Sequence, residues 1–152
     1  MDERILPRTS SDEYRGRTIA LWLFAVVILL KTGISAASIF NAHDAISKAD
    51  GIPLDSFPPA AARALQSVFM LLGWSNLVFC IVAVVVLLRY RALVPVMYAL
   101  WLLYELGKRA VLYVMPIERA GGTSGLVVTL SILAVMVVGF LLSLGRRGRA
   151  IP

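Results

Sequence analysis

The chain has 152 residues, of which 59% are apolar and only 16% are charged, with a mean hydropathy of +0.82. This composition excludes an ordinary soluble domain, whose apolar share is nearer to about half, and indicates a membrane protein. The formal charge of +6 raises the question of nucleic-acid binding. Its basic residues, however, flank apolar runs in short groups instead of forming one polar surface, so we expect no nucleic-acid partner.

The length allows several membrane spans but no separate domain, because a spanning helix needs about 20 apolar residues. Four such runs fit in the sequence. The longest polar stretch between them, 43–63, is far shorter than the ~40 residues at which an unaided soluble domain becomes plausible. We therefore predict an all-α membrane protein, a four-transmembrane-helix up-down-up-down bundle, without an extramembrane domain to carry chemistry.

The first predicted span covers 18–42 and follows a polar tail at 1–17, which we expect to be mobile and cytoplasmic. The tail carries four acidic and four basic side chains and almost nothing that could be buried. An apolar run from Ile19 to Leu30 opens the span and is followed directly by Lys31. The span therefore contains one ionisable side chain.

The second predicted span covers 64–88 and contains Asn76. It follows the loop at 43–63, which holds three prolines and ends in the start of a helix. A very short turn, Arg89–Tyr90–Arg91, connects it to the next span.

The third predicted span covers 92–115 and has Glu105, Lys108 and Arg109 in its second half. The fourth covers 123–144 and contains no ionisable residue. A basic tail at 145–152, predicted to be cytoplasmic, closes the chain.

Orientation follows from the Lys and Arg residues beside the spans, because cytoplasmic flanks carry the excess. With the N-terminus inside, nine such residues lie on the cytoplasmic side and three outside. The inner group is Arg4, Arg8, Arg15, Arg17, Arg89, Arg91, Arg146, Arg147 and Arg149, and the outer group is Lys48, Arg63 and Arg119. We predict a multi-pass protein of the bacterial inner (cytoplasmic) membrane with both termini cytoplasmic and the lipid bilayer as its environment.

A cleaved secretory signal is the alternative interpretation of the first span. Arg15 to Ala37 has a basic flank, an apolar stretch and small residues at Ser35–Ala37, the order found in such signals. The polar extension before Arg15 and the position of Lys31 count against it. Cleavage would remove the first span and leave the other three with the same orientation.

Polar side chains recur at one depth in all four predicted spans. At 1.5 Å per residue, Lys31 and Glu105 each lie ~20 Å from the inner end of their span. Asn76 and Ser131 fall ~18 to 20 Å from the same side. We expect a buried polar layer in which Lys31 pairs with Glu105 while Asn76 and Ser131 supply hydrogen bonds, since an unpaired charge near the bilayer centre costs roughly 3 kcal/mol or more.

Two simpler interpretations remain open for these charges. Lys31 could extend its ammonium group toward the outer interface without any partner. Glu105 could pair only along its own helix, because Lys108 and Arg109 follow it by three and four residues. The alternatives are compatible, since one carboxylate can accept from both helices.

The outer half also holds more positive than negative charge, with +3 from Lys31, Lys108 and Arg109 against −1 from Glu105. These cations either reach outward to the interface or hold an anion, such as a lipid phosphate or a small carboxylate. We consider Lys108, Arg109, Arg63 and Arg119 as candidate anion or lipid contacts.

Catalytic and metal-binding signals are weak. Cys80 lies alone in an apolar run, and His43 beside Asp44 is typical of a solvated pair. No Cys or His cluster suggests a metal or a haem, and the serines have no base at a recognisable spacing. We therefore predict no catalytic residue, no metal site and no cofactor.

Two functions fit these expectations. The first is a non-catalytic accessory or assembly protein whose polar layer serves packing, with a second copy or another membrane protein as partner. The second is a small transporter or anionic-lipid-binding protein that uses the basic residues of the outer half. An intramembrane enzyme is a distant third.

Overall fold

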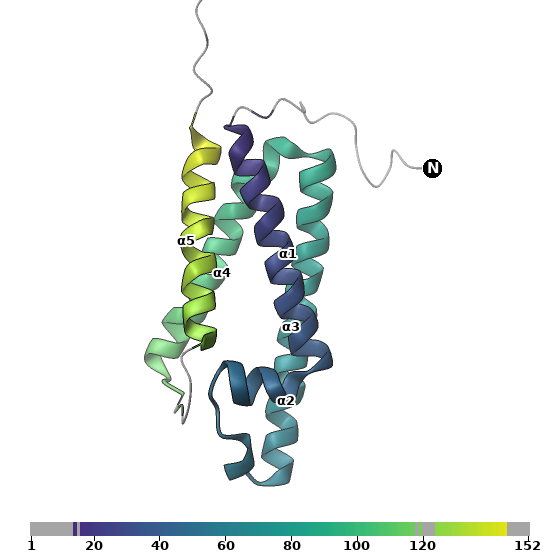
Figure 1. Cartoon of the computed structure of the whole chain (residues 1–152), viewed down its shortest axis with the longest axis vertical. Coiled ribbons are helices and arrows are strands. Elements are labelled where there is room, and N and C mark those ends of the chain that lie inside the picture. The colour runs from purple at the N-terminus through teal and green to yellow at the C-terminus, as the bar shows by residue number, and fades with distance from the viewer. Residues whose placement is uncertain (1–13, 15, 118, 120–123, 146–152) are drawn as a thin grey trace, which may run out of the picture.

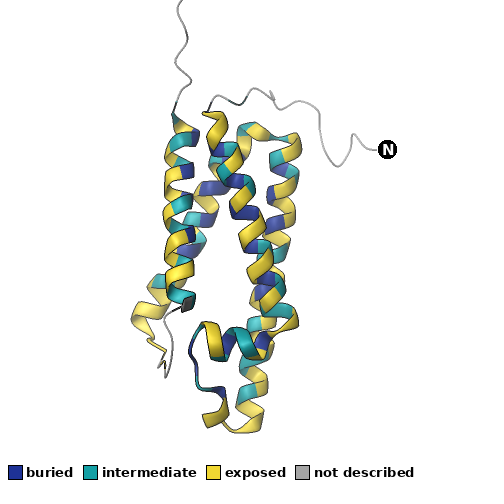
Figure 2. Cartoon of the chain, viewed as in Figure 1, coloured by how far each residue is buried: buried dark blue, intermediate teal, exposed yellow. Residues whose placement is uncertain are grey.

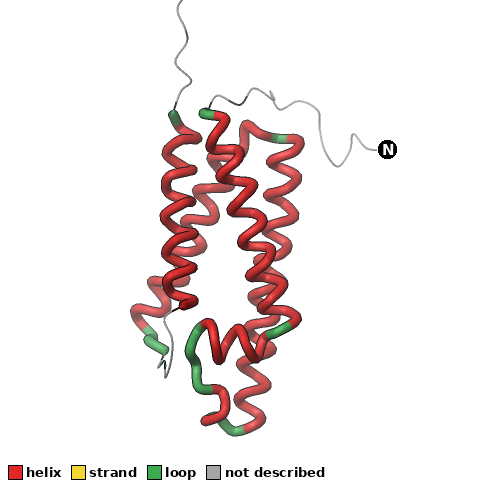
Figure 3. The backbone as a smooth tube through the Cα atoms, in the orientation of Figure 1, coloured by secondary structure: helices red, strands yellow, loops and turns green. Residues whose placement is uncertain are grey.

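The computed structural model describes residues 14, 16–117, 119 and 124–145. This part of the chain is helical and contains no strand (Figure 3). The predicted tails lie mostly outside the described residues. Where the first tail ends, the backbone N–H of Arg17 donates to the carbonyl oxygen of Leu142, at 3.3 Å.

Three helices are long and apolar enough to cross a membrane: α1 (Thr18–Phe40), α3 (Pro59–Arg89) and α5 (Ser124–Leu144). They match the first, second and fourth predicted spans, which confirms a helical protein suited to a membrane. The third prediction corresponds to α4 (Val94–Val114) and the short η3 (Arg91–Leu93) before it. With 21 residues α4 is long enough to cross a membrane. Because it contains Glu105, Lys108 and Arg109, however, it is not among the three apolar helices.

Helix α3 begins at Pro59, at the end of the predicted loop where the sequence indicated the start of a helix, and five residues before the predicted span. Pro59 occupies its first turn, where the missing N–H breaks no helical hydrogen bond. Its 31 residues give a length of ~46 Å at 1.5 Å per residue, which exceeds the ~30 Å of a bilayer's hydrocarbon core.

The predicted loop between α1 and α3 is largely folded. It contains α2 (Ala42–Asp44), the π-helical turn η1 (Ala45–Ala49) and the short η2 (Leu54–Ser56), and we call residues 42–56 the cap segment. Gly51 allows the turn between them, since its φ of 70° is unfavourable for other residues. The cap segment has its own small core, made with the first turns of α3: Ile46, Ile52, Leu54, Ala62, Leu65 and Phe69.

The four long helices lie beside one another, with the cap segment at one end (Figure 1). Helix α1 packs against α3 and α5, and α4 packs mainly against α5. Within the four long helices, most buried residues lie toward the end opposite the cap segment (Figure 2). There Phe24 of α1 contacts the rings of Tyr98 and Trp101 of α4, with ring centroids 5.0 and 5.4 Å apart.

Candidate functional site

An ion pair joins α1 to α4 inside the protein. The ammonium group of Lys31 donates to Oε1 of Glu105, and the two side chains retain only 7% and 4% of their exposure. Each residue lies one helical turn beyond an apolar core residue of its own helix: Lys31 follows Ile28 by three positions, and Glu105 follows Trp101 by four. Packing of these core residues therefore places the two charged side chains at the same level along the helices.

The second oxygen of Glu105 accepts from its own helix. Lys108 lies one turn further along α4, and its Nζ is 2.9 Å from Oε2 of Glu105. The Lys108 side chain is 44% exposed, so it forms the accessible edge of the cluster. Glu105 thus contacts both of its expected lysine partners, one across the helices and one along α4.

An aromatic ring lies beside both lysines. The Tyr104 ring centroid is 4.8 Å from Nζ of Lys108 and 6.0 Å from Nζ of Lys31, and Trp101 also lies within 5.8 Å of the latter. Ring faces attract cations, and the attraction grows where water is excluded. Tyr104 also stacks on Phe79 of α3, with centroids 6.1 Å apart. Tyr104 was not among the residues predicted for this site, although it is an aromatic residue directly before Glu105 in the sequence.

Asn76 reaches the same level from α3. Its Nδ2 donates to Oγ of Ser35 at 2.6 Å, and lies 3.4 Å from the carbonyl oxygen of Lys31. Ser35 is buried and its hydroxyl donates to that same carbonyl, at 2.7 Å. Ser35 was not among the predicted layer residues, but it follows Lys31 by four residues and so shares its helix face.

Ser131 does not join the cluster. It is exposed on α5, and its hydroxyl donates to the carbonyl oxygen of Val127 on the same helix, at 2.9 Å. The expected layer is therefore corrected: three helices supply it through Lys31, Asn76 and Glu105, and Ser35 replaces Ser131. The position of Ser131 along α5 was not sufficient to predict that it joins the cluster, because its side chain is exposed on the outer face of the helix.

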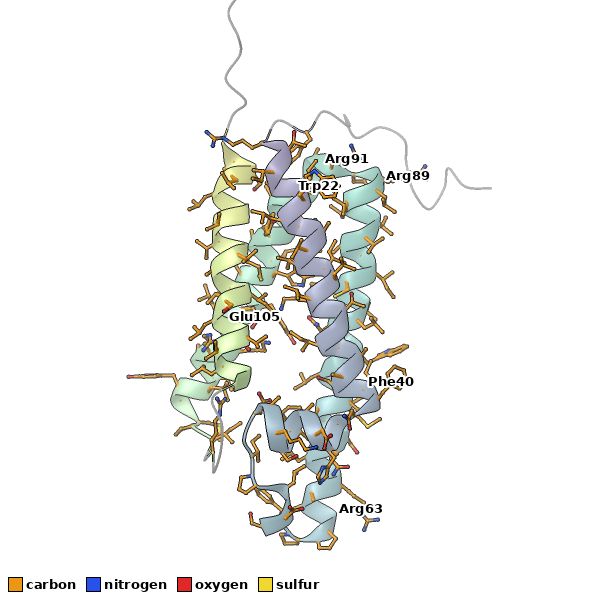
Figure 4. All side chains as sticks on the ribbon, in the orientation of Figure 1. Trp22, Phe40, Arg63, Arg89, Arg91 and Glu105 are labelled. Carbon is orange, nitrogen blue, oxygen red and sulfur yellow. The ribbon has the colours of Figure 1, made fainter. Side chains whose placement is uncertain are left out.

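The candidate anion contacts are divided between two places. Arg109 is half-buried on α4 next to Lys108, and its Nε is buried without a hydrogen-bond partner within the described chain. Arg63 is exposed near the start of α3, far from Glu105, and donates to Pro59 (Figure 4). Arg63 therefore does not extend a site at Lys108 and Arg109.

Asp50 of the cap segment lies toward the same region. Burial raises the pKa of its carboxyl group, and the positive charges of Arg119 and Lys108 act in the opposite direction. An Ala side chain at Gly125, in the first turn of α5, would come within 2.9 Å of Oδ1 of Asp50. Asp50 thus connects the cap segment to α5, a link that sequence analysis did not predict.

His43 takes part in an exposed cluster on the cap segment. Its Nδ1 is 3.6 Å from Asp44, and its Nε2 is 4.0 Å from Asp55. Hydrogen bonds from Lys48 and Asn41 hold the pKa of the Asp44 carboxyl below its usual range. Neither this cluster nor any other group of three His, Cys, Asp or Glu side chains among the described residues is placed to hold a metal ion.

No known family model matches the chain, and no curated protein or solved structure shows significant similarity to it.

The cluster as a whole is suited to holding helices together. Both oxygens of Glu105 are engaged by ammonium groups, and Lys31 is enclosed by Glu105, Trp101 and Tyr104. Each carboxylate oxygen of Glu105 thus accepts from one ammonium group, and the contact with Lys31 joins α4 to α1.

Proposed function

We propose that this chain is a small, non-catalytic integral membrane protein, an accessory or assembly protein with four spanning helices fixed by an internal ion pair. The observation that supports it is the Lys31–Glu105 pair, whose two side chains are 7% and 4% exposed and belong to different helices. Such a pair lets α4 lie in hydrocarbon despite its charges, because pairing offsets the cost of burying each one.

The outward-facing side chains support a bilayer around all four helices. Trp22 and Phe40, near the two ends of α1, are 72% and 87% exposed. They are separated by ~27 Å along the helix axis, close to the ~30 Å of the hydrocarbon core. Aromatic side chains favour the two interfaces of a membrane, so these residues mark the expected boundaries.

The orientation that we propose is N-terminus and C-terminus in the cytoplasm of a bacterial inner membrane. Arg89 and Arg91 lie at one end of the molecule and Arg63 at the other (Figure 4). The end with Arg89 and Arg91 also holds the starts of α1 and α4. The excess of basic residues in the sequence therefore lies at the end that we assign to the cytoplasm, in agreement with the positive-inside rule. The cap segment then faces the outside.

Transport through the charged layer is less well supported than a packing role. A pathway would need the charges to contact water, whereas Lys31 and Glu105 are almost fully enclosed. The partners that remain as proposals are bilayer lipids and either a second copy or another membrane protein.

Cysteine labelling in intact cells tests the membrane arrangement. In a Cys80→Ser background, Asp55→Cys on the cap segment should react with a membrane-impermeant maleimide. Leu93→Cys, at the opposite end, should react only after the membrane is opened. Labelling of both positions in intact cells, or loss of the protein from carbonate-washed membranes, would contradict the proposal.

A further inference from the structure

The apolar core ends at the level of the ion pair. All buried residues of α4 lie between Val94 and Glu105, and none follows in the last turns of that helix. In α5 no described residue before Ile132 is buried. Beyond Glu105, therefore, α4 and α5 have no fully buried side chain among the described residues until the level of the cap segment is reached.

Helix α1 behaves differently over the same length. Beyond Lys31 its buried residue is Ser35, which contacts Asn76 of α3. An added side chain at Gly73 of α3 would also meet Ser35 and Ser38, at 3.1 and 2.9 Å, so α1 and α3 stay in close contact. The core thus opens between the α1–α3 pair and the α4–α5 pair, on the side of the cap segment.

Positive charge is concentrated at this opening. Glu105 offsets the charge of Lys31, which leaves Lys108 and Arg109 without a full counter-charge on α4. Asp50 interacts electrostatically with Arg119 and Lys108, and the formal charges of Asp50 and Arg119 offset each other. The sum of these six charges is +2, from four cations and two carboxylates.

Lys108 and Arg109 follow one another on α4, about 100° apart around the helix axis, so the ends of their long side chains are the parts that can approach one ligand. Lys108 forms an ion pair with Glu105, and its ammonium group also lies over the ring of Tyr104. Arg109 presents a buried Nε that has no partner within the described chain. A guanidinium group binds phosphate through two parallel hydrogen bonds and an ammonium group adds a point charge, so the pair fits a phosphate-type anion.

The depth also fits a phosphate at the membrane surface. Arg109 is ~23 Å from the start of α4, which leaves ~7 Å to the outer edge of a hydrocarbon core of ~30 Å. An arginine side chain can extend over that distance toward the head groups.

We propose that Lys108 and Arg109 bind a phosphate group where the helix pairs separate, with the Lys31–Glu105 pair as the inner boundary of the site. The phosphate belongs either to the head group of an anionic lipid or to a free phosphate that enters from the outside. The side from which the phosphate enters rests on the proposed membrane orientation. The residues that would bind it do not depend on that orientation.

Native mass spectrometry of the full chain in detergent tests the site, with phosphatidylglycerol, diacylglycerol and inorganic phosphate as separate probes. Phosphatidylglycerol should bind in preference to diacylglycerol, which has the same acyl chains without a phosphate. Arg109→Gln should weaken its binding by about tenfold or more, the size expected for losing a charge-assisted hydrogen bond. Arg63→Gln is the matched control, since it removes the same charge on the same side and should change binding by less than about twofold.

The outcomes separate the sources of the phosphate. Binding of inorganic phosphate that also depends on Arg109 identifies a free phosphate as ligand, whereas Arg109-dependent binding of the lipid alone identifies a head group. Equal losses in Arg109→Gln and Arg63→Gln, or no preference for the phosphate-bearing lipid, would overturn the proposal. Arg109→Lys keeps the charge and should retain part of the affinity, and circular dichroism of each variant shows whether it is folded.

Discussion

Lys31 of α1 and Glu105 of α4 are 74 positions apart in the sequence and form an ion pair in the interior of the protein. The pair lies where the apolar core ends and the charged part of α4 begins. It therefore closes the core on one side and forms the inner boundary of the proposed phosphate site on the other. Its free-energy contribution is the first quantity to measure.

A double-mutant cycle on Lys31→Met and Glu105→Gln should show strong coupling. Each single change leaves a buried partner without its counterpart, and we expect a loss of ~3 kcal/mol in the free energy of unfolding. The double change should lose at least ~1 kcal/mol less than the sum of the two. Unfolding of the full chain in mixed detergent micelles gives these values.

The exposed pair of Lys48 and Asp44, with a distance of 2.9 Å, serves as the control cycle. Because water surrounds it, its coupling should stay below ~1 kcal/mol. Simple additivity at Lys31 and Glu105 would show that the buried pair does not act as one unit.

The contact between α1 and α3 should tolerate no added side chain at Gly73. A methyl group there would lie 2.9 Å from Cβ of Ser38 and 3.1 Å from the carbonyl oxygen of Ser35, and backbone cannot yield easily. We expect Gly73→Ala to lower the free energy of unfolding by ~1 to 3 kcal/mol. Gly33→Ala, with no atom within 4 Å of the new methyl group, should be neutral or stabilising. Equal effects of the two changes would contradict this close helix contact.

The hydroxyl of Tyr98 should contribute to the packing of α4 on α1. It is buried and donates to the carbonyl oxygen of Ala20, at 3.0 Å. Tyr98→Phe should therefore lower the free energy of unfolding by about 1 kcal/mol, the net worth of a buried hydrogen bond. Tyr113→Phe is the control, because Tyr113 is 89% exposed. A loss at Tyr113 as large as that at Tyr98 would argue against the bond.

Two carboxylates of the cap segment should respond to pH with opposite signs. Burial raises the pKa of Asp50, so its stabilising contribution is complete below the pKa of the unfolded chain and is lost as pH rises through the folded pKa. Asp50→Asn should therefore stabilise the protein at neutral pH and have little effect in acid. Lys48 and Asn41 lower the pKa of Asp44, so Asp44→Asn should destabilise at neutral pH, and this loss should vanish as pH falls.

Thermal unfolding of both variants and of the wild type, over a series of pH values, measures these differences. A stabilisation by Asp50→Asn that persists at low pH would mean that ionisation of Asp50 is not its cause.

The sequence alone predicted the four long helices and the position of each polar residue along its helix, but not the helical turns of the cap segment. An apolar run of sufficient length predicts a span, and the constant rise of 1.5 Å per residue fixes the depth of Lys31, Asn76 and Glu105. Helix α4 carries too many charges to count among the apolar helices, and the core of the cap segment forms only through contacts with α3, which no local sequence pattern encodes.

Only the tertiary structure decided how each helix is rotated about its axis. Ser131 has the predicted depth but faces outward, whereas Ser35 faces α3 and bonds to Asn76. Helix α5 is apolar on every face, so its hydropathy pattern carries no information about the face that is buried. The rotation is set by side-chain packing between helices, and for that reason the pairing of Lys31 with Glu105, and the separation of Arg63 from Arg109, became visible only in three dimensions.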